Sequence, residues 1–153
     1  MVYLYPANFD TFMFEKQMPV EECANMIIMA EACYVVDKDL KFVSDNMDLL
    51  EKWVVYLEKF GLIPANQLCT DDFAGHLDKN INLAIKATVG IGCYAKLCEA
   101  LGRVDDFNKY NKLAKEFASK IEEFAYKFFA EIKNNNGFTP TIKAVFNKKN
   151  NDK

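Results

Sequence analysis

Two adjacent carboxylates, Asp71 and Asp72, are the residues of this chain whose types best suit acid–base chemistry. They lie in a polar segment, residues 66–80, with the sequence NQLCTDDFAGHLDKN, between two long helix-forming runs. Hydrolysis of an amide or an acetal can use two carboxylates, one as acid and one as base, when their environments separate their pKa values. We expect one of the pair to be functional and the other to be a cap or a hydrogen-bond acceptor. Alternatively, both cap the following helix, because Asp is favoured at helix starts.

A second acidic pair, Glu21 and Glu22, lies near the start of the first expected helix. Asn25 follows Glu22 by three residues and therefore shares its helix face. This helix is apolar on most sides, and an unpaired buried carboxylate on it would be costly, so the pair is a second candidate for chemistry. The alternative is that both glutamates are exposed to water and complement the positive end of the helix dipole.

The only histidine, His76, lies in the same polar segment as the aspartates. It could act as a base or contact a substrate, or it could be a structural histidine with satisfied hydrogen bonds. Asn80 is a further candidate for substrate contact, and Gln67 and Lys86 are weaker ones. One histidine with scattered cysteines does not suit a zinc site, and no GxGxxG, P-loop, GxSxG or HExxH motif occurs. We therefore expect no metal and no cofactor.

The composition indicates a globular domain that does not bind nucleic acid. The chain has 153 residues, of which 51% are hydrophobic, and a net charge of −3, which is not the basic surface that nucleic acid requires. Five cysteines without CxxC spacing are typical of reduced thiols. Residues 1–10 have neither a charged start nor a long apolar run, so they predict no signal peptide and no membrane span. As it stands the chain is expected in the cytoplasm, although a longer parent could be secreted.

Hydrophobic periodicity predicts four helices that alternate in character. The first and third are apolar nearly all round, and the second and fourth are amphipathic. The helices are expected at about residues 19–36, 40–60, 78–101 and 105–133. A buried helix followed by an amphipathic one, repeated after roughly 58 residues, is typical of helical hairpins in an α/α toroid or solenoid. The fold class is therefore all-α, with residues 1–133 as a partial toroid domain and residues 134–153 as an Asn/Lys-rich tail.

Small residues and glycines indicate where these helices end or approach one another. Gly61 is expected to end the second helix as a C-cap. Gly90 and Gly92 lie inside the third helix, where each costs roughly 1 kcal/mol relative to alanine, so a closely packed neighbour is expected there. Residues 1–17 are expected to be an aromatic, extended lead-in, and residues 141–146 a short strand.

Two segments of the chain resemble the glutaminase A family. They are MPVEECANM at 18–26 and W-x-x-YLEKFGLIPANQLCTDDFAGHLDKNINLAIKATVGI at 53–91. The resemblance covers roughly residues 3–130 and implies a six-hairpin, glycosidase-like α/α toroid that hydrolyses glutamine to glutamate and ammonia. In such toroids the ends of the inner helices line a central cavity, which favours Glu22, Asp71 and Asp72 as site residues. Six hairpins need twelve helices, so a chain with about four is expected to be a fragment with an incomplete site.

Three functional hypotheses follow for the chain. The first is a segment of a glutaminase A-like hydrolase that acts on a small-molecule substrate. The second is a glycoside-processing toroid with Glu22 and an aspartate as acid and base. The third is a non-catalytic helical module that self-associates through unpaired helix faces. The expected catalytic residues are Asp72, Asp71 and Glu22, and the expected substrate-binding residues are Glu21, Asn25, Gln67, His76 and Asn80.

Overall fold

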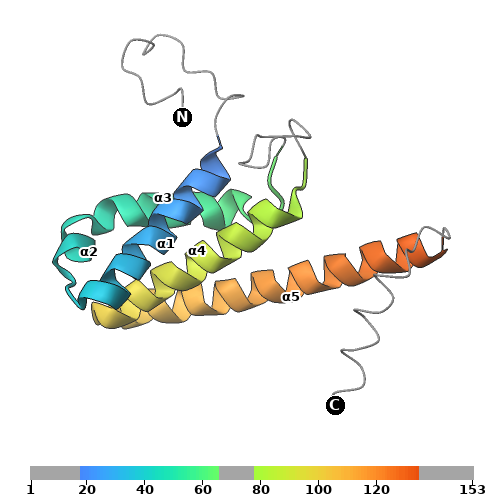
Figure 1. The fold of residues 1–153 in the computed structure, drawn as a ribbon. Helices are drawn as coiled ribbons and strands as arrows, with labels where there is room; N and C mark the ends of the chain where they lie inside the picture. The colour runs from blue at the N-terminus through green and yellow to red at the C-terminus, as the bar shows by residue number, and fades with distance from the viewer. Residues whose placement is uncertain (1–17, 66–77, 135–153) are drawn as a thin grey trace, which may run out of the picture. The chain divides into compact units, whose positions relative to one another are not determined.

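The computed structural model describes residues 18–65 and 78–134, which form α-helices and no strand within those ranges. The helices are α1 (Pro19–Asp37), α2 (Lys41–Asp45), α3 (Met47–Phe60), α4 (Ile81–Ala100) and α5 (Val104–Asn134), as Figure 1 shows. The prediction of an all-α fold is confirmed. The chain divides into two compact units, residues 1–121 and 122–153, so that α5 contributes to both.

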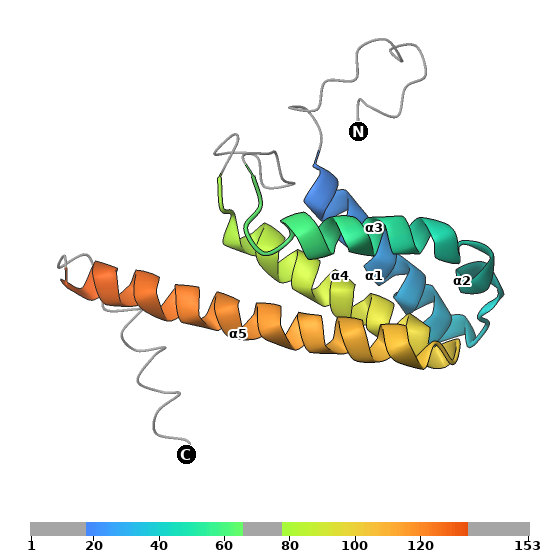
Figure 2. The same ribbon diagram turned by 180° about the vertical axis from the view of Figure 1, so that it is seen from behind.

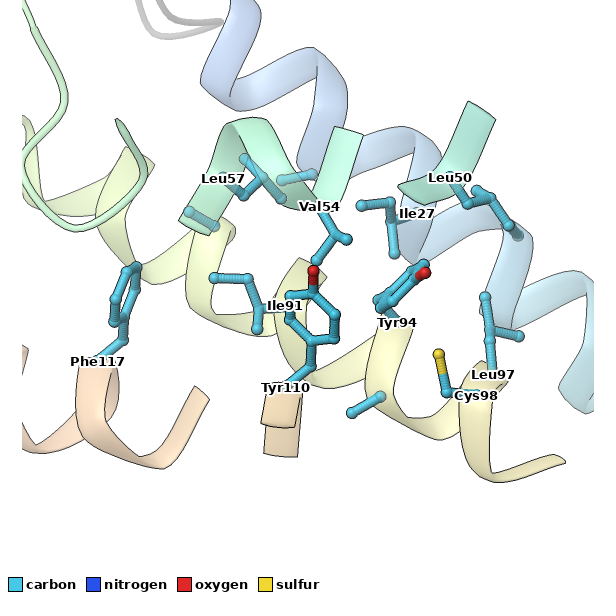
Figure 3. Packing of buried hydrophobic residues seen from close by; sticks show 14 of the residues in the cluster. Ile27, Leu50, Val54, Leu57, Ile91, Tyr94, Leu97, Cys98, Tyr110 and Phe117 are labelled. Carbon is cyan, nitrogen blue, oxygen red and sulfur yellow. The ribbon is translucent and has the colours of Figure 1, made fainter. Parts of the chain in front are cut away.

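The first unit is built on α1 and α4, which lie side by side and run parallel (Figures 1 and 2). α3 packs against both of them. The buried side chains of the three helices form one continuous apolar core, part of which Figure 3 shows. This core includes Ala24 and Ile27 of α1, Val54 and Leu57 of α3, and Ile91 and Tyr94 of α4. The two apolar helices thus occupy the centre, as their composition predicts.

The first part of α5 is attached to the same core by aromatic packing and by ion pairs. Tyr110 is buried and meets Tyr94 of α4 edge to face, with ring centroids 4.9 Å apart. Lys109 forms an ion pair with Glu58 of α3 at 2.8 Å. The amphipathic helices α3 and α5 therefore contact each other as well as the apolar pair, which agrees with the predicted alternation of inner and outer helices.

Gly90 allows the close approach of α1 and α4. A Cβ placed on Gly90 would lie 3.1 Å from the Cα of Ala24, which leaves almost no room for a side chain. At Gly92 a Cβ would meet only the Cβ of Ala114 at 3.9 Å, an ordinary contact. The predicted tight packing is confirmed at Gly90 and is wrong at Gly92. Gly61 does end α3, but with φ of −78°; a Cβ there would lie 2.7 Å from that of Ala87.

The predicted second helix is broken in two. Asn46 has φ −115° and ψ 12°, outside the helical region, and separates α2 from α3. Its side-chain amide donates a 2.8 Å hydrogen bond to the carbonyl of Phe42. Asparagine competes in this way with the helical hydrogen-bond ladder. The continuous apolar periodicity across this residue hid the break, so the prediction of one helix over 40–60 is wrong at Asn46.

The start of α4 is set by Asn80 rather than by Asp78. The Oδ1 atom of Asn80 accepts a 2.9 Å hydrogen bond from the backbone N–H of Asn82, the usual N-cap arrangement. The cap that was predicted as an alternative role for Asp71 and Asp72 is therefore provided by Asn80. Those aspartates, the lead-in at 1–17 and the strand expected at 141–146 all lie outside the described residues.

One side of the apolar pair is exposed, which corrects the prediction that α1 is buried on most sides. On α1, Met29 is 59% exposed and Val36 is 79% exposed. On α4, Ile85 and Val89 are each nearly half exposed. α4 also has the length and composition of a membrane-spanning helix, a property shared by core helices, and half of it is buried here. The absence of a membrane span remains a prediction.

Candidate functional site

An ion pair between the first turn of α1 and the second turn of α4 is the central feature of the candidate site. Lys86 of α4 donates a hydrogen bond from its ammonium group to the carboxylate of Glu21 on α1. Glu21 is 3% exposed and the Lys86 side chain is 34% exposed. The two residues meet because the helices run parallel with their N-terminal ends together, the arrangement that also brings Ala24 against Gly90.

The burial of Glu21 contradicts the alternative prediction that Glu21 and Glu22 are both exposed to water. A glutamate that only complements the helix dipole would be exposed to water, and Glu21 is not. A buried carboxylate is tolerated when a cation compensates its charge, and Lys86 does so here. The predicted role of Glu21 in substrate binding stays a prediction, although its carboxylate already has Lys86 as a partner.

Glu22 is half-buried and differs chemically from its neighbour. Burial raises the pKa of its carboxyl above the ordinary value of 4.5, and the adjacent charge of Glu21 raises the pKa further. A carboxylic acid that keeps its proton to higher pH is suited to donate that proton to a leaving group. Asn25 is also half-buried, on the same helix and three residues further on. The geometry is thus compatible with the predicted catalytic role of Glu22, which it does not test.

The segment that joins α3 to α4, residues 66–77, is called the connector, and it begins and ends at the same end of the first unit as Glu22. The residues on either side of it are held close together, because the backbone N–H of Lys79 donates a 2.9 Å hydrogen bond to the carbonyl of Pro64. Pro64 is itself a buried residue. Lys86 follows Lys79 by seven residues, which corresponds to about 10 Å at the rise of an α-helix. The remaining predicted site residues lie outside the described residues, and their roles stay predictions: Gln67, Asp71, Asp72 and His76.

A groove of about 280 Å³ lies beside the ion pair, between α1 and α4. Its walls are mainly apolar, with Lys86 and Asn82 as the polar residues that line it. The lining residues are Ile28 of α1 and Asn82, Ile85, Lys86 and Val89 of α4. From the sequence alone, Lys86 is one of the weaker candidates for substrate contact. The signal that could have found it is that Lys86 is the only charged residue in the first three turns of the mostly apolar helix α4, which implies a buried counter-charge.

Three of the described cysteines, Cys23, Cys93 and Cys98, are poorly suited to act as nucleophiles. Cys23 and Cys93 are half-buried, and burial raises the pKa of each to about 11, so both are protonated at neutral pH. Cys98, which is fully buried, behaves in the same way. Residues 18–65 and 78–134 also contain no group of three His, Cys, Asp or Glu side chains placed to hold a metal ion. The expectation of a metal-free site remains a prediction for the whole chain.

Two apolar helices flanked by two amphipathic ones define a helical-hairpin scaffold. Comparison with known families shows to which family this scaffold belongs. The family described as the glutaminase A six helical-hairpin domain matches residues 4–150. The chain therefore belongs to this family, as the motifs at 18–26 and 53–91 indicate.

Two curated relatives have glutaminase in their names. Glutaminase A of Aspergillus oryzae is 40% identical over 106 residues, which are 69% of this chain and 15% of that protein. A probable glutaminase of Arthroderma benhamiae is 37% identical over 86 residues, 56% of this chain and 10% of that protein. The chain thus corresponds to a small part of each relative. No solved structure matches it.

Proposed function

We propose that this chain is a segment of a glutaminase A-like hydrolase that cleaves the side-chain amide of glutamine to give glutamate and ammonia. The observation that carries the proposal is the position of Glu22. It is an acid with a raised pKa, next to a buried Glu21–Lys86 pair, at the end of the unit where the connector 66–77 begins and ends. The names of the relatives supply the substrate.

Amide hydrolysis needs a base for the attacking water and an acid for the leaving nitrogen. In the proposed reaction, water attacks the carbonyl carbon after losing a proton to a carboxylate, for which Asp71 and Asp72 are the candidates. The C–N bond then breaks, and the nitrogen leaves as ammonia after taking a proton from Glu22. The Glu21–Lys86 pair fixes the first turn of α1 and thereby the position of Glu22.

The experiment is ammonia release from L-glutamine. It is carried out with the chain itself and with a chimaera in which the chain replaces the matching segment of the Aspergillus oryzae relative, because the chain spans only 15% of that protein. We expect Glu22→Gln and Asp72→Asn each to lower kcat of the active form by about 100-fold or more, the usual contribution of a general acid or base.

The matched control is Asp48→Asn, an exposed carboxylate on α3. It should leave kcat unchanged, and circular dichroism should show that all variants keep their helical content. Unchanged turnover in Glu22→Gln and Asp72→Asn would contradict the assignment of these residues. A chimaera that folds but releases no ammonia from glutamine would contradict the proposed function itself.

A further inference from the structure

The groove between α1 and α4 combines an apolar surface with a fixed cation. Ile28, Ile85 and Val89 form the apolar part, and Ile85 and Val89 are each nearly half exposed. Lys86 lines the same groove with a side chain that is one-third exposed. The volume of about 280 Å³ is near the lower end of the range found for small-molecule sites.

The hydrogen bonds of Lys86 determine what this groove can recognise. An ammonium group has three N–H donors, and among the described residues Lys86 has one hydrogen-bond partner, the carboxylate of Glu21. That bond holds the ammonium at the groove, so little conformational entropy is lost when a ligand binds. The amide of Asn82 lines the groove as well and can donate a further hydrogen bond.

The charges favour an oxygen acceptor on a short aliphatic stem. Glu21 compensates the charge of Lys86, so the pair together is neutral and does not require an anionic ligand. The remaining N–H groups of Lys86 can still donate hydrogen bonds, and a carbonyl or carboxylate oxygen of a ligand can accept them. Methylene groups next to that oxygen would cover the exposed apolar surface of Ile85 and Val89.

We propose that this groove is a substrate subsite in which Lys86 and Asn82 donate hydrogen bonds to a carboxamide or carboxylate oxygen and the α1–α4 wall holds the aliphatic stem. The substrate class rests on the proposed function, because glutamine carries both kinds of oxygen on a short aliphatic stem. The subsite makes Lys86 a substrate-binding residue, while Glu21 positions it.

The test follows the methyl groups of the full chain by NMR while three probes are added: L-glutamine, butyramide and butyrate. We expect the signals of Ile28, Ile85 and Val89 to shift and those of Val55, exposed on α3, to stay unchanged. Binding of butyramide without butyrate would place the carboxamide end of glutamine at Lys86. Binding of butyrate would place the carboxylate end there. Either result supports the subsite.

The variants separate recognition from stability. Lys86→Met alone removes the ammonium that pairs with the buried carboxylate of Glu21, so the informative variant is Glu21→Gln with Lys86→Met, which removes both charges. It should weaken binding of L-glutamine by about tenfold or more, the effect of losing a charge-assisted hydrogen bond. Lys96→Met is the matched control, because Lys96 is exposed on the same helix and pairs with Glu99. It should bind the probe as the unaltered chain does.

Two results would overturn the subsite: no shift of the groove methyl signals with any probe, or equal binding by the double variant. The experiment distinguishes failure of the subsite from failure of the proposed function. Ammonia release with an unchanged KM in the double variant would remove the subsite and leave the glutaminase proposal intact. Probe binding at the groove in a chimaera that releases no ammonia would contradict the glutaminase proposal and leave the subsite intact.

Discussion

Glu21 and Glu22 are adjacent in the sequence, yet the fold gives them different chemistry. Glu21 faces α4 and is ion-paired with Lys86, whereas Glu22 is half-buried and its pKa is raised. The sequence could predict that a carboxylate at this position would be costly unless it was paired or functional. It could not predict which of the two would be paired, because that depends on the rotation of α1 about its axis relative to α4.

The ion pair is expected to contribute to stability through the cost of breaking it. Glu21→Gln removes the carboxylate that pairs with the Lys86 ammonium, and Lys86→Met removes that ammonium from beside a buried carboxylate. We expect Lys86→Met to lower the free energy of unfolding by about 2–4 kcal/mol, below the largest values for such pairs because Lys86 is partly exposed. Urea denaturation at neutral pH measures the difference.

The control for this prediction is Lys96→Met in the same helix. Lys96 and Glu99 form a 2.8 Å ion pair in which both side chains are at least half exposed. Such pairs contribute roughly 0–1 kcal/mol. Equal losses in the two variants would mean that the Glu21–Lys86 pair behaves as a surface pair.

The raised pKa of Glu22 predicts a pH dependence with a definite sign. Between the ordinary value of 4.5 and the raised pKa, the folded chain holds more protons on Glu22 than the unfolded chain. The stabilising contribution is therefore complete below 4.5 and is lost as the pH rises through the folded pKa. Glu22→Gln cannot lose a proton, so its stability relative to the unaltered chain should increase with pH.

Urea denaturation of both proteins at about pH 4 and about pH 7.5 measures this difference. An NMR titration of the Glu22 carboxyl carbon gives the pKa directly. A stability difference that is the same at both pH values would contradict the prediction, as would a carboxyl that titrates at or below 4.5.

At the scale of the helices, hydrophobic periodicity predicted the number and character of the long elements. It placed α1 and α5 within a residue or two of their ends because Pro19, Gly102 and the apolar stripe of α5 are strong local signals. The break at Asn46 and the cap at Asn80 were missed, because each depends on a side-chain hydrogen bond rather than on periodicity. The residue is asparagine at both the helix break and the helix cap. Asparagine also occurs at exposed positions inside helices, so its presence alone predicts neither feature.

The two glycines of α4 provide a matched test of helix packing. Gly90→Ala gains about 1 kcal/mol of helix propensity but places a methyl group 3.1 Å from Ala24 on α1. Overpacking of this kind costs about 1–3 kcal/mol, so we expect a net loss of stability. Gly92→Ala has room, with its nearest neighbour at 3.9 Å, and should gain up to about 1 kcal/mol.

Thermal unfolding of the two variants checks this prediction. Both substitutions are chemically identical and lie two residues apart in one helix. The gain in helix propensity is therefore the same in both variants, and any difference in stability between them comes from packing. A Gly90→Ala variant as stable as Gly92→Ala would show that α1 and α4 can separate at no cost.

At the scale of the whole chain, the sequence predicted the family and the all-α class better than the site. The motif around the connector 66–77 is specific enough to identify the family, and the family match over 4–150 agrees. The site depends on which helix ends come together, and residues distant in the sequence, such as Glu21 and Lys86, carry no local signal of that contact. The chain also corresponds to only 15% and 10% of its relatives, so further site residues could come from regions it does not include.

The division of α5 between two units predicts unequal protection along one helix. Up to Ile121, α5 contributes buried residues such as Tyr110 and Phe117. Over 122–127, every side chain except that of Ala125 is exposed, and the 2.6 Å pair of Glu123 with Lys127 is a surface pair. Exposed helical segments with few buried contacts open at lower free energy than the core.

Native-state amide hydrogen exchange of the full chain tests this. We expect amides at 124–127 to exchange at least about 100-fold faster than those of Ile91 to Leu97 in α4, which would correspond to opening at lower free energy than global unfolding. Equal protection along the whole of α5 would contradict the division at Ile121.

The hydrogen bond between Lys79 and Pro64 has a consequence for how the family can diversify. It joins backbone atoms, so no side chain takes part in it, although the φ of 56° at Lys79 favours glycine or asparagine at that position. We therefore expect that a segment of different length or sequence can be joined between Pro64 and Lys79 while these two anchoring points of α3 and α4 stay in place. Loop exchange at this position offers a route to new specificities without redesign of the helices that support it.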